Sequence, residues 1–400
     1  MFETTQAAPQ LLAPAAATAA PAAKPDYAAR RERAWRLAKE HDGALDALLC
    51  CDGHDIHYLT GVHEGIFWLV ISASGTFGIS RHMLIDEVRA EASDCEILLP
   101  SERYTAPVDQ EKFLVEELVR RGLGCVGSVL GRMSVPTYLK LTGPLSACES
   151  FCLKAVPDGV GSLRAVKDGG EIALVRRCVA IAEQALIELV QAGAGGWIGR
   201  SEREISAELE ARMRALGADR QAFPGTGLIV GAGPNSASAH HQCGDTRIQR
   251  GDTVLIDWGA ELHSYRSDMT RTFFIGSVPE YAQRAYPVVE QAMLRAAAAL
   301  RPGVLTHEID HLARETVLAD GYPEFYYGVG HGIGLDIHES PWLRINGADR
   351  LKENMITTVE PGIYLPGVGG IRIENDYLIT ADGYECMGSM TTRLEDMLIC

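Results

Sequence analysis

The sequence predicts a small α/β domain followed by a larger α+β domain, on three observations. Four hundred residues exceed the size that one hydrophobic core usually serves, so two domains are expected. Strand-like and helical segments alternate over about residues 27–155, which is typical of an α/β domain. After the Gly/Pro-rich residues 157–161, paired helical patterns flank several strand-like segments, which favours an α+β arrangement. We therefore expect domains at residues 26–157 and 158–400.

The first residues predict neither a signal peptide nor a folded element. Residues 1–25 are rich in alanine and proline. They lack the basic segment of a secretion signal, and the prolines interrupt its apolar core. We expect a disordered tail here and, since no run of 18 or more strongly apolar residues occurs, no membrane span. This interpretation predicts a cytoplasmic location.

The expected elements of the first domain follow one another closely. A helix begins near Tyr27 with an arginine-rich pattern (RRERAWRLAKEH), and the apolar run ALDALLCC after it predicts a buried strand. We interpret the segment FWLVISASGTFGISR as two short strands around a Ser-Gly turn. Residues 111–122 have helical apolar spacing and end on a glycine, which suits the left-handed residue that closes many helices.

The second domain is expected to begin with two helices. The first spans about residues 170–192, and the second begins at Ser201, where Glu204 completes a capping box. The runs TVLIDWGAEL and YRSDMTRTFFIG then have the apolar character of strands. Two more helices are expected at about residues 279–300 and 307–319, and strands and loops follow them.

The amino-acid composition argues against some classes of binding partner, nucleic acid first among them. The chain has 53 acidic and 37 basic residues and a net charge of −16, which disfavours binding to a nucleic-acid backbone. Its 46% hydrophobic and 22% charged residues are ordinary for a soluble globular protein. The ten cysteines show no C-x-x-C pair and no regular spacing, so we interpret them as mostly buried, reduced thiols.

Five side chains suited to metal binding occur along the second domain. Four carboxylates and one imidazole form an oxygen-rich set, which suits a pair of divalent ions better than one structural zinc. Two ions in such a site activate water for hydrolysis. If the five side chains converge in space, the protein is a metal-dependent hydrolase. The five are Asp257, Asp268, His331, Glu360 and Glu374.

The carboxylates stand in strand-like surroundings. Asp257 and Asp268 lie on two runs that can pair as a hairpin with both side chains on one face; the alternative is a pair of turn-capping aspartates. A carboxylate inside the apolar run VLIDWG needs a partner, because burying it unpaired is costly. Glu360 precedes a Pro-Gly turn. Alternation in GIRIEND places Arg372 and Glu374 on one face of a strand. There Arg372 either supports a metal site that includes Glu374, or the two residues form an ordinary surface ion pair.

Several histidines accompany these carboxylates. His331 lies among glycines that let a backbone or ligand approach closely, but the spacing is not that of a nucleotide loop. His338 follows seven residues later, and His240 and His241 lie in a loop before the predicted hairpin, where an imidazole can act as a proton shuttle. Taken singly, each histidine is better interpreted as a hydrogen-bonded or exposed side chain.

Taken together, these residues resemble a known family. The second domain resembles the pita-bread metallopeptidases of the prolidase and aminopeptidase P type, family M24, over about residues 160–390. The matching segments are NSASAHH, LIDWGAELHSYRSDMTRTF, GHGIGLDIHESP, TVEPGIYLPG and GGIRIENDYLIT. The first domain resembles, more loosely, the creatinase-like N-terminal domain of that group, and LRAVKDGGEIALVR marks the junction. The resemblance implies a pita-bread catalytic domain preceded by a smaller α/β domain.

For the metal ions, the resemblance implies a shared set of ligands. Asp257 would chelate one ion, and Asp268 and Glu374 would bridge both. His331 and Glu360 would complete the shell of the second ion. Members of the group usually hold manganese or cobalt, so two divalent ions are expected, with manganese as the first choice and cobalt or zinc as alternatives. Members are commonly dimers or tetramers, and a homodimer is expected.

For catalysis, the resemblance implies hydrolysis of the bond before proline in di- or oligopeptides. Glu360 would accept a proton, and His338 would hydrogen-bond the tetrahedral oxyanion. His240 would contact the substrate, and Arg372 would support the site. One departure is Asn375, where the group has an acidic residue; this change removes no ligand.

The resemblance leaves the substrate open. Relatives on this fold include the creatinase and ectoine-hydrolase types, which cleave non-peptide C–N bonds, and a dimethylsulfoniopropionate lyase. The presence of all five ligands favours a metallohydrolase over a metal-free enzyme or a non-catalytic binding module. A dipeptidase must recognise the free carboxylate of Xaa-Pro, whereas an aminopeptidase must leave room beyond the proline, and the sequence does not choose between them.

Overall fold

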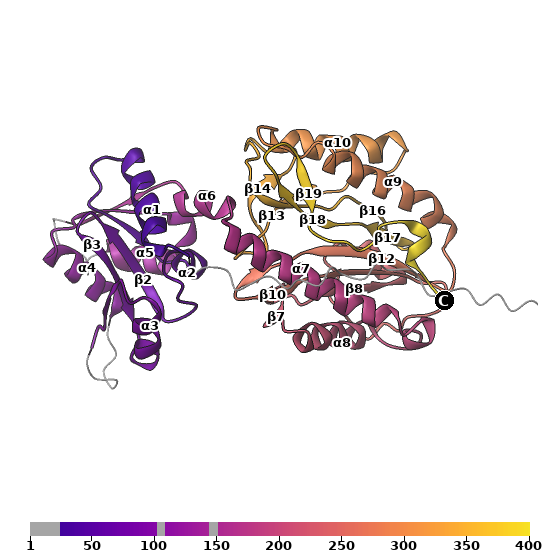
Figure 1. Ribbon diagram of the computed structural model, residues 1–400, viewed down its shortest axis with the longest axis horizontal. Helices are drawn as coiled ribbons and strands as arrows, with labels where there is room; N and C mark the ends of the chain where they lie inside the picture. The colour runs from indigo at the N-terminus through magenta and orange to yellow at the C-terminus, as the bar shows by residue number, and fades with distance from the viewer. Residues whose placement is uncertain (1–24, 102–108, 144–150) are drawn as a thin grey trace, which may run out of the picture. The chain divides into compact units, whose positions relative to one another are not determined.

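The computed structural model describes residues 25–101, 109–143 and 151–400. The folded chain forms two compact units, and the boundary between them along the sequence lies between Arg164 and Ala165 (Figure 1). The boundary expected from the sequence lies a few residues earlier, after Pro157, because the short helix at Gly159–Ala165 packs with the first unit and the Gly/Pro pattern does not show this. The predicted tail, apart from Pro25, lies outside the described residues.

The first unit is built on one mixed sheet of order β4-β3-β2-β1-β5-β6. β1, β5 and β6 run parallel to one another, while β2 is antiparallel to both β1 and β3. The strands are β1 Ala47–Cys50, β2 Ile66–Ser72, β3 Gly75–Ser80, β4 Glu96–Leu98, β5 Cys125–Ser128 and β6 Cys152–Ala155. The helices are α1 Tyr27–His41, α2 Gly53–Thr60, α3 Ile85–Glu91, α4 Gln110–Arg120, α5 Val135–Thr142 and α6 Gly159–Ala165.

The core of this unit follows from the expected patterns. The predicted hairpin around the Ser-Gly turn is present as β2 and β3, and the ALDALLCC run supplies the fully buried β1. Leu114 and Leu118, one helical turn apart on α4, pack into the core cluster with Trp68 of β2. After α4 the chain turns at Gly122, whose φ of 71° lies in the left-handed region, as the closing glycine predicts.

The second unit stacks helices on both sides of several small sheets. A four-stranded sheet has the order β20-β12-β9-β8, and a five-stranded sheet has the order β14-β13-β15-β18-β19. α9 and α10 lie along one side, and α7 and α8 along the other (Figure 1). The helices are α7 Gly169–Val190, α8 Glu202–Ala215, α9 Glu280–Ala297 and α10 Thr306–Ala319.

Two shorter sheets complete this unit, with orders β11-β10-β7 and β16-β17. The strands are β7 Arg220–Gln221, β8 Ile229–Ala232, β9 Thr253–Trp258, β10 Ala260–Leu262, β11 Tyr265–Arg266, β12 Met269–Ile275, β13 Gly330–Gly332, β14 Glu339–Leu343, β15 Ile356–Val359, β16 Gly362–Leu365, β17 Gly369–Arg372, β18 Asn375–Ile379, β19 Tyr384–Cys386 and β20 Leu398–Ile399.

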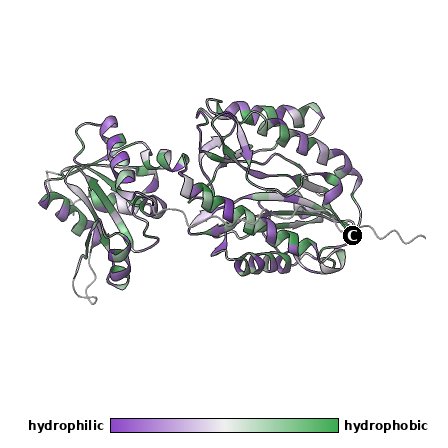
Figure 2. Ribbon diagram, viewed as in Figure 1, coloured by the Kyte–Doolittle hydropathy of each residue, from purple (hydrophilic) through white to green (hydrophobic). Residues whose placement is uncertain are grey.

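The helices begin and end close to where the sequence places them. The capping box predicted at Ser201 and Glu204 is present at the start of α8. α8, α9 and α10 each carry both hydrophilic and hydrophobic residues, as expected of helices that cover a core from one side (Figure 2). Within the described ranges, no helix is both long and apolar enough to cross a bilayer.

One predicted strand is wrong in detail. The alternating GIRIEND segment is not one strand, because β17 ends at Arg372 and β18 begins at Asn375. β17 pairs with β16, whereas β18 pairs with β15 and β19 in a different sheet. The chain therefore passes from one sheet to another at Ile373 and Glu374, and Glu374 makes an isolated bridge with Thr270.

Candidate metal centre

The predicted hairpin brings the first two carboxylates into the core. β9 and β12 pair antiparallel, with Asp257 opposite Thr270. Asp268 lies immediately before β12 rather than at mid-strand, and its backbone N–H donates to the carboxylate of Asp376 at 3.0 Å. Both carboxylates are buried, with 6% of Asp257 and 3% of Asp268 exposed, so neither is an exposed turn cap.

The other three predicted ligands come from the neighbouring sheets. His331 is the middle residue of β13, Glu360 follows β15, and Glu374 lies at the crossing between β17 and β18. The bridge between Glu374 and Thr270 sets the glutamate beside the β9–β12 hairpin, and the Thr270 hydroxyl donates to Glu374 Oε2 at 2.7 Å. The structure thus brings all five side chains to one place.

Their donor atoms form three overlapping groups. His331 Nε2 lies 3.2 Å from Glu360 Oε1 and 3.7 Å from Asp268 Oδ2. Within each group, one donor atom per residue lies within 4.8 Å of the others. The groups are Asp257, Asp268 and Glu374; His331, Glu360 and Glu374; and Asp268, His331 and His338. His331, Asp268 and Glu374 are each shared between two groups, and the two shared carboxylates are the kind of donor that can bridge a pair of ions.

The electrostatics of the cluster call for cations. Desolvation raises the pKa of Asp268 and of Glu374 well above their ordinary values, and the neighbouring carboxylates raise them further. Burial likewise raises the pKa of Glu360 to about 7, although the nearby Arg372 acts in the opposite direction. Several carboxylates held so close without bound cations repel one another, and each loses its hydration.

Unsatisfied oxygens show that divalent ions fit the cluster. Asp257 Oδ1, Asp268 Oδ1 and Glu374 Oε1 are buried and accept no hydrogen bond. Buried carboxylate oxygens almost always have a partner in folded proteins, and metal ions are the partners that suit a set of oxygen donors with one imidazole. The residues present therefore match the divalent ions that the sequence predicts.

The tautomer of His331 also suits a ligand. Its Nδ1 lies 3.1 Å from the carbonyl oxygen of Gly332, an acceptor that requires a proton on Nδ1. That leaves the lone pair of Nε2 directed at the carboxylates, as a metal-binding imidazole needs. Burial lowers the pKa of His331 to about 4, so the ring stays neutral near pH 7.

Arg372 supports the cluster in a way that the sequence does not reveal. The interpretation of Arg372 and Glu374 as a surface pair is wrong, since only 2% and 1% of the two residues are exposed. Arg372 instead pairs with Asp257 through Nη2. It also donates to the Thr270 hydroxyl at 2.9 Å and to the phenol of Tyr364 at 3.0 Å. One buried cation thus offsets part of the negative charge and holds Asp257 in place.

The cluster opens into a pocket of about 280 Å³. His338 stands at the pocket with its ring 4.3 Å from that of His331, and the ring of Trp342 lies 6.4 Å from both imidazoles, stacked on that of His338. His240 also lines the pocket, whereas His241 is held away by a 2.8 Å contact with Glu202. The other lining residues are Ala239, Tyr327, Gly328, Gly330, Arg344, Glu360 and Arg372.

Sequence reasoning missed the residues around the ligands. Asp376 is fully buried and receives the backbone N–H of Asp268, and its place two residues after Glu374 was the available signal. Asn375, where the family resemblance predicts an acidic residue, accepts a hydrogen bond from Arg271 through its side-chain oxygen at 2.7 Å. The same guanidinium donates to the backbone carbonyl of Glu374 at 2.6 Å and so fixes a ligand-bearing segment.

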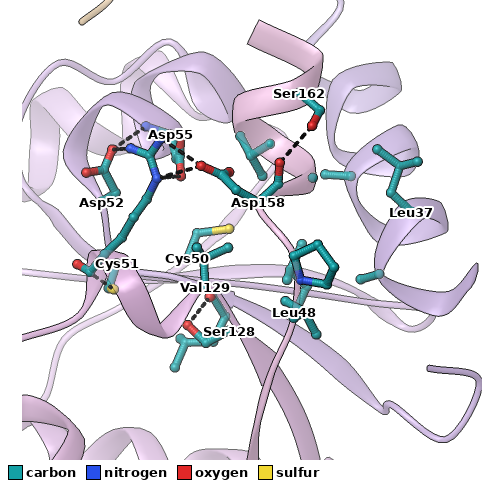
Figure 3. Close-up of a pocket in the computed structure, with 18 residues that line it drawn as sticks. Leu37, Leu48, Cys50, Cys51, Asp52, Asp55, Ser128, Val129, Asp158 and Ser162 are labelled. Atoms are coloured by element: carbon teal, nitrogen blue, oxygen red, sulfur yellow. Dashed lines mark hydrogen bonds and ion pairs between the residues drawn. The ribbon is translucent and has the colours of Figure 1, made fainter. Parts of the chain in front are cut away.

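A second cavity, of about 210 Å³, lies in the first unit (Figure 3). Its lining includes Leu48 and Cys50 of β1 and Ser128 at the end of β5, and Leu37 adds to its apolar wall (Figure 3). Arg132 at its rim contacts Asp158 at 2.8 Å and Asp52 at 3.4 Å. None of the predicted site residues lies there, and its rim charges pair with one another, so the chemistry belongs to the metal centre.

The fold and the donor set together define a metal-dependent hydrolase. Comparison with known families agrees: the model of metallopeptidase family M24 matches residues 173–381, and that of the creatinase/prolidase N-terminal domain matches residues 30–154. The chain belongs to metallopeptidase family M24. Its second unit is accordingly the pita-bread domain, and its first unit is the creatinase-like domain.

Individual relatives extend the match over most of the chain. The Xaa-Pro dipeptidase of Pyrococcus horikoshii is 32% identical over 346 residues, which cover 85% of this chain and 92% of that protein. A solved structure of an Xaa-Pro dipeptidase from Bacillus anthracis has a TM-score of 0.85 at 28% identity, covering 94% and 100% of the two chains. The X-Pro aminopeptidase from Thermotoga maritima has a TM-score of 0.77 at 30% identity, covering 92% and 99%.

The raised pKa of Glu360 predicts an unusual pH dependence of the chelated protein. Glu360 titrates near 7 in the folded state and near its ordinary value of 4.5 when unfolded, so the folded state binds the additional proton between these values. Stability therefore falls as the pH rises through this window. We expect Glu360→Gln, whose amide does not titrate, to unfold several degrees above the chelated wild type at about pH 7.5 but not at about pH 4.5.

Thermal unfolding of both proteins in excess chelator measures this difference. His331, whose pKa burial lowers, acts in the opposite direction in both proteins, and because its Nε2 lies 3.2 Å from Glu360 the comparison measures the titration of Glu360 together with its effect on His331. A difference in Tm that stays constant from pH 4.5 to pH 7.5 would contradict the assignment of the titration to Glu360.

Proposed function

We propose that this chain hydrolyses the Xaa-Pro peptide bond of proline-containing dipeptides. The observation that carries the proposal is the convergence of five potential ligands, four of them buried and Glu360 half-buried, beside a pocket that opens onto two histidines. Two of the similar proteins, from P. horikoshii and B. anthracis, are named Xaa-Pro dipeptidases. Family membership supports metal-dependent peptide hydrolysis, and the relatives support the proline specificity.

In this proposal each ligand keeps the role expected from the sequence. Asp257 would chelate one ion, Asp268 and Glu374 would be shared by the two ions, and His331 and Glu360 would complete the shell of the second ion. Divalent ions held there polarise the scissile carbonyl and lower the pKa of water. Manganese is proposed because four of the five donors are carboxylates, which suit a harder ion than zinc.

The surrounding residues handle protons and developing charge. Glu360 is the proposed proton acceptor, since its carboxylate lines the pocket and lies 3.2 Å from His331. His338 and His240 both line the pocket and are proposed to bind the substrate and stabilise the oxyanion. Arg372 acts on the reaction through Asp257, which it orients.

A specific observation favours dipeptides over longer peptides. The exposed Arg344 lines the same pocket, with its guanidinium 5.7 Å from the ring of Trp342. It gives the free carboxylate of a dipeptide a cationic partner, while the Trp342 and Tyr327 rings supply an apolar wall for the proline. A tripeptide has an uncharged amide at the position of that carboxylate and loses this interaction.

Hydrolysis of Ala-Pro and of Ala-Pro-Ala, with manganese and after chelation, tests the proposal. We expect metal-dependent cleavage of the dipeptide in preference to the tripeptide. Arg344→Met should raise KM for the dipeptide by about tenfold or more, the value of a charge-assisted hydrogen bond, and leave the tripeptide unaffected. Arg301→Met, an exposed arginine outside the pocket, is the matched control.

Each outcome separates the alternatives. Release of alanine from the tripeptide at equal efficiency would instead indicate an aminopeptidase P. Failure to cleave either peptide with metal bound would contradict peptide hydrolysis and indicate a small non-peptide substrate, as in the ectoine-hydrolase, creatinase and dimethylsulfoniopropionate-lyase types. Failure to bind divalent ions at all would overturn the metallohydrolase assignment itself.

His338→Ala is expected to lower kcat by about 10²-fold or more, the usual contribution of a positioned proton donor. Metal affinity should change much less, because the proposed role is with the substrate. The His338 ring nevertheless lies within reach of Asp268 and His331, so the geometry also allows it to be a ligand. An equal loss of metal binding and turnover would show that His338 is a ligand. His311→Ala, an exposed histidine on α10, serves as the control.

Two further proposals come from the family resemblance rather than from this geometry. We propose that the protein is a homodimer and that it acts in the cytoplasm. Sedimentation equilibrium of the full chain tests the first, with a single monomeric mass as the contradicting result. Fractionation of the source cells, with the activity assay as readout, tests the second.

A further inference from the structure

Two cysteines stand side by side at the start of neighbouring strands in the first unit. β5 and β6 run parallel, and their register sets Cys125 directly opposite Cys152. Neighbouring strands lie about 4.8 Å apart, and disulfides form between Cα atoms about 4.4–6.8 Å apart. Paired residues of adjacent strands project to the same face of the sheet, so the backbone already holds both thiols within bonding range.

The two thiols contact each other in the reduced protein. The pKa of the Cys125 thiol is raised from its ordinary value, first by desolvation and then by a hydrogen bond with the Cys152 thiol. Lys154 follows two residues after Cys152, so it lies on the same face of β6. The ammonium group of Lys154 lowers the pKa of Cys125, because it favours the thiolate. Lys154 also pairs with Asp42 at 2.7 Å, and the net shift of the Cys125 pKa is upward, so the placement of the two thiols by the backbone, and not an activated thiolate, favours the bond.

The pair is open to a reagent. β6 is an edge strand of the six-stranded sheet, and Cys152 is exposed on it, while Cys125 is half-buried behind it. Cys50 and Cys178 are buried, but the interpretation of the cysteines as mostly buried is wrong: of the nine cysteines among the described residues, four are half-buried and three are exposed. Among the strand pairs of the described residues, none other sets two cysteines opposite each other.

We propose that Cys125 and Cys152 form a site of reversible oxidation that closes to a cross-strand disulfide. With glutathione disulfide as the oxidant, the Cys152 thiolate attacks one glutathione sulfur and releases the other glutathione as a thiolate. The Cys125 thiolate then attacks the Cys152 sulfur of this mixed disulfide and releases the second glutathione. Two protein thiols are oxidised, one glutathione disulfide is reduced to two thiols, and the two thiol protons pass to solvent or to the released glutathione.

The closed disulfide stabilises the first unit without touching the metal centre. It links residues that lie 27 positions apart, and the link restricts the unfolded chain more than the folded one, in which the two residues are already neighbours. The stabilisation should appear as a rise of several degrees in the unfolding midpoint of the first unit. The proposal is independent of the peptidase assignment, because none of the metal-centre residues takes part.

Mass spectrometry of the full chain tests the proposal. The protein is equilibrated with glutathione disulfide, alkylated, and cut with trypsin without reduction. We expect the tryptic peptides Gly122–Arg132 and Leu141–Lys154 to appear joined, and to separate on reduction. Fragmentation should place the link on Cys152 rather than on Cys148, which lies in the same peptide.

Matched variants make the outcome decisive. Cys148→Ser should keep the link and the rise in unfolding midpoint, and Cys152→Ser should lose both. A link that survives in Cys152→Ser would overturn the proposal. It would also be overturned if Cys152 of the wild type carries only bound glutathione, or if both cysteines are fully alkylated while the exposed Cys386 reacts with glutathione disulfide.

Discussion

Replacing Glu374 or Asp268 by alanine is expected to abolish peptide hydrolysis. Each of these two carboxylates belongs to two of the three donor groups, so its loss removes donors from both proposed ion positions. Metal ions contribute several kcal/mol of transition-state stabilisation, which corresponds to a loss of more than about 10³-fold in kcat/KM. Steady-state hydrolysis of Ala-Pro, together with the metal content of the purified proteins, measures the effect.

The same substitutions should not destabilise the chelated protein. Glu374 is almost fully buried, and desolvation and its carboxylate neighbours raise its pKa, so an alanine relieves repulsion in the absence of ions. A folded but inactive variant therefore separates a lost ligand from a lost fold. Glu385→Ala, on the exposed strand β19, is the matched control and should keep full activity. Wild-type turnover in folded Glu374→Ala would refute the bridging role.

Two of the proposed ligands stand out in the sequence because each conflicts with its local pattern. Asp257 sits inside an apolar run, and His331 sits among glycines, so each needs an explanation beyond strand propensity. The glycines have a packing reason, since a Cβ on Gly330 would lie 2.1 Å from the Thr358 carbonyl oxygen of the adjacent strand β15. Such a pattern can be detected in the sequence because it reflects a requirement at one position, here the close approach of a neighbouring strand to Gly330.

The partners of those residues were not predictable in the same way. Alternation predicts Arg372 and Glu374 on one face of a single strand, whereas the chain changes sheets between them, and it carries no information on which strand lies opposite. The actual partner of Arg372 is Asp257, 115 residues away, and the pairing depends on the chain changing sheets after Arg372. Contacts between distant segments are decided by packing of whole sheets, and a single sequence does not reveal that packing.

The junction between the two domains also contains a residue whose partner the sequence does not reveal. The motif that marks it, LRAVKDGGEIALVR, contains Lys167, and the sequence gives this lysine no function. In the structure its ammonium group lies 2.8 Å from Glu339 Oε1, and only 1% and 7% of the two side chains are exposed. Glu339 directly follows His338, and its other carboxylate oxygen accepts a backbone N–H from Asp336 at 3.4 Å. We therefore expect Lys167 to act as a positioning residue for the loop that carries His338.

Lys167→Met is expected to destabilise the protein by about 3–5 kcal/mol, because it leaves the carboxylate of Glu339 buried without its cation. Turnover should fall as well, since Glu339 no longer holds the turn that presents His338 to the pocket. Urea unfolding measures the first effect. Assays of the remaining folded protein, with kcat and KM determined separately, measure the second.

The double variant Lys167→Met/Glu339→Met distinguishes the two effects. Replacing a buried ion pair by apolar side chains of similar volume is often neutral, so most of the lost stability should return. The carboxylate contact to the Asp336 turn does not return, so kcat should stay low while metal content is normal. If the double variant regains full turnover along with stability, the ion pair serves only the fold, and the placement of His338 depends on the ring contacts with His331 and Trp342 instead.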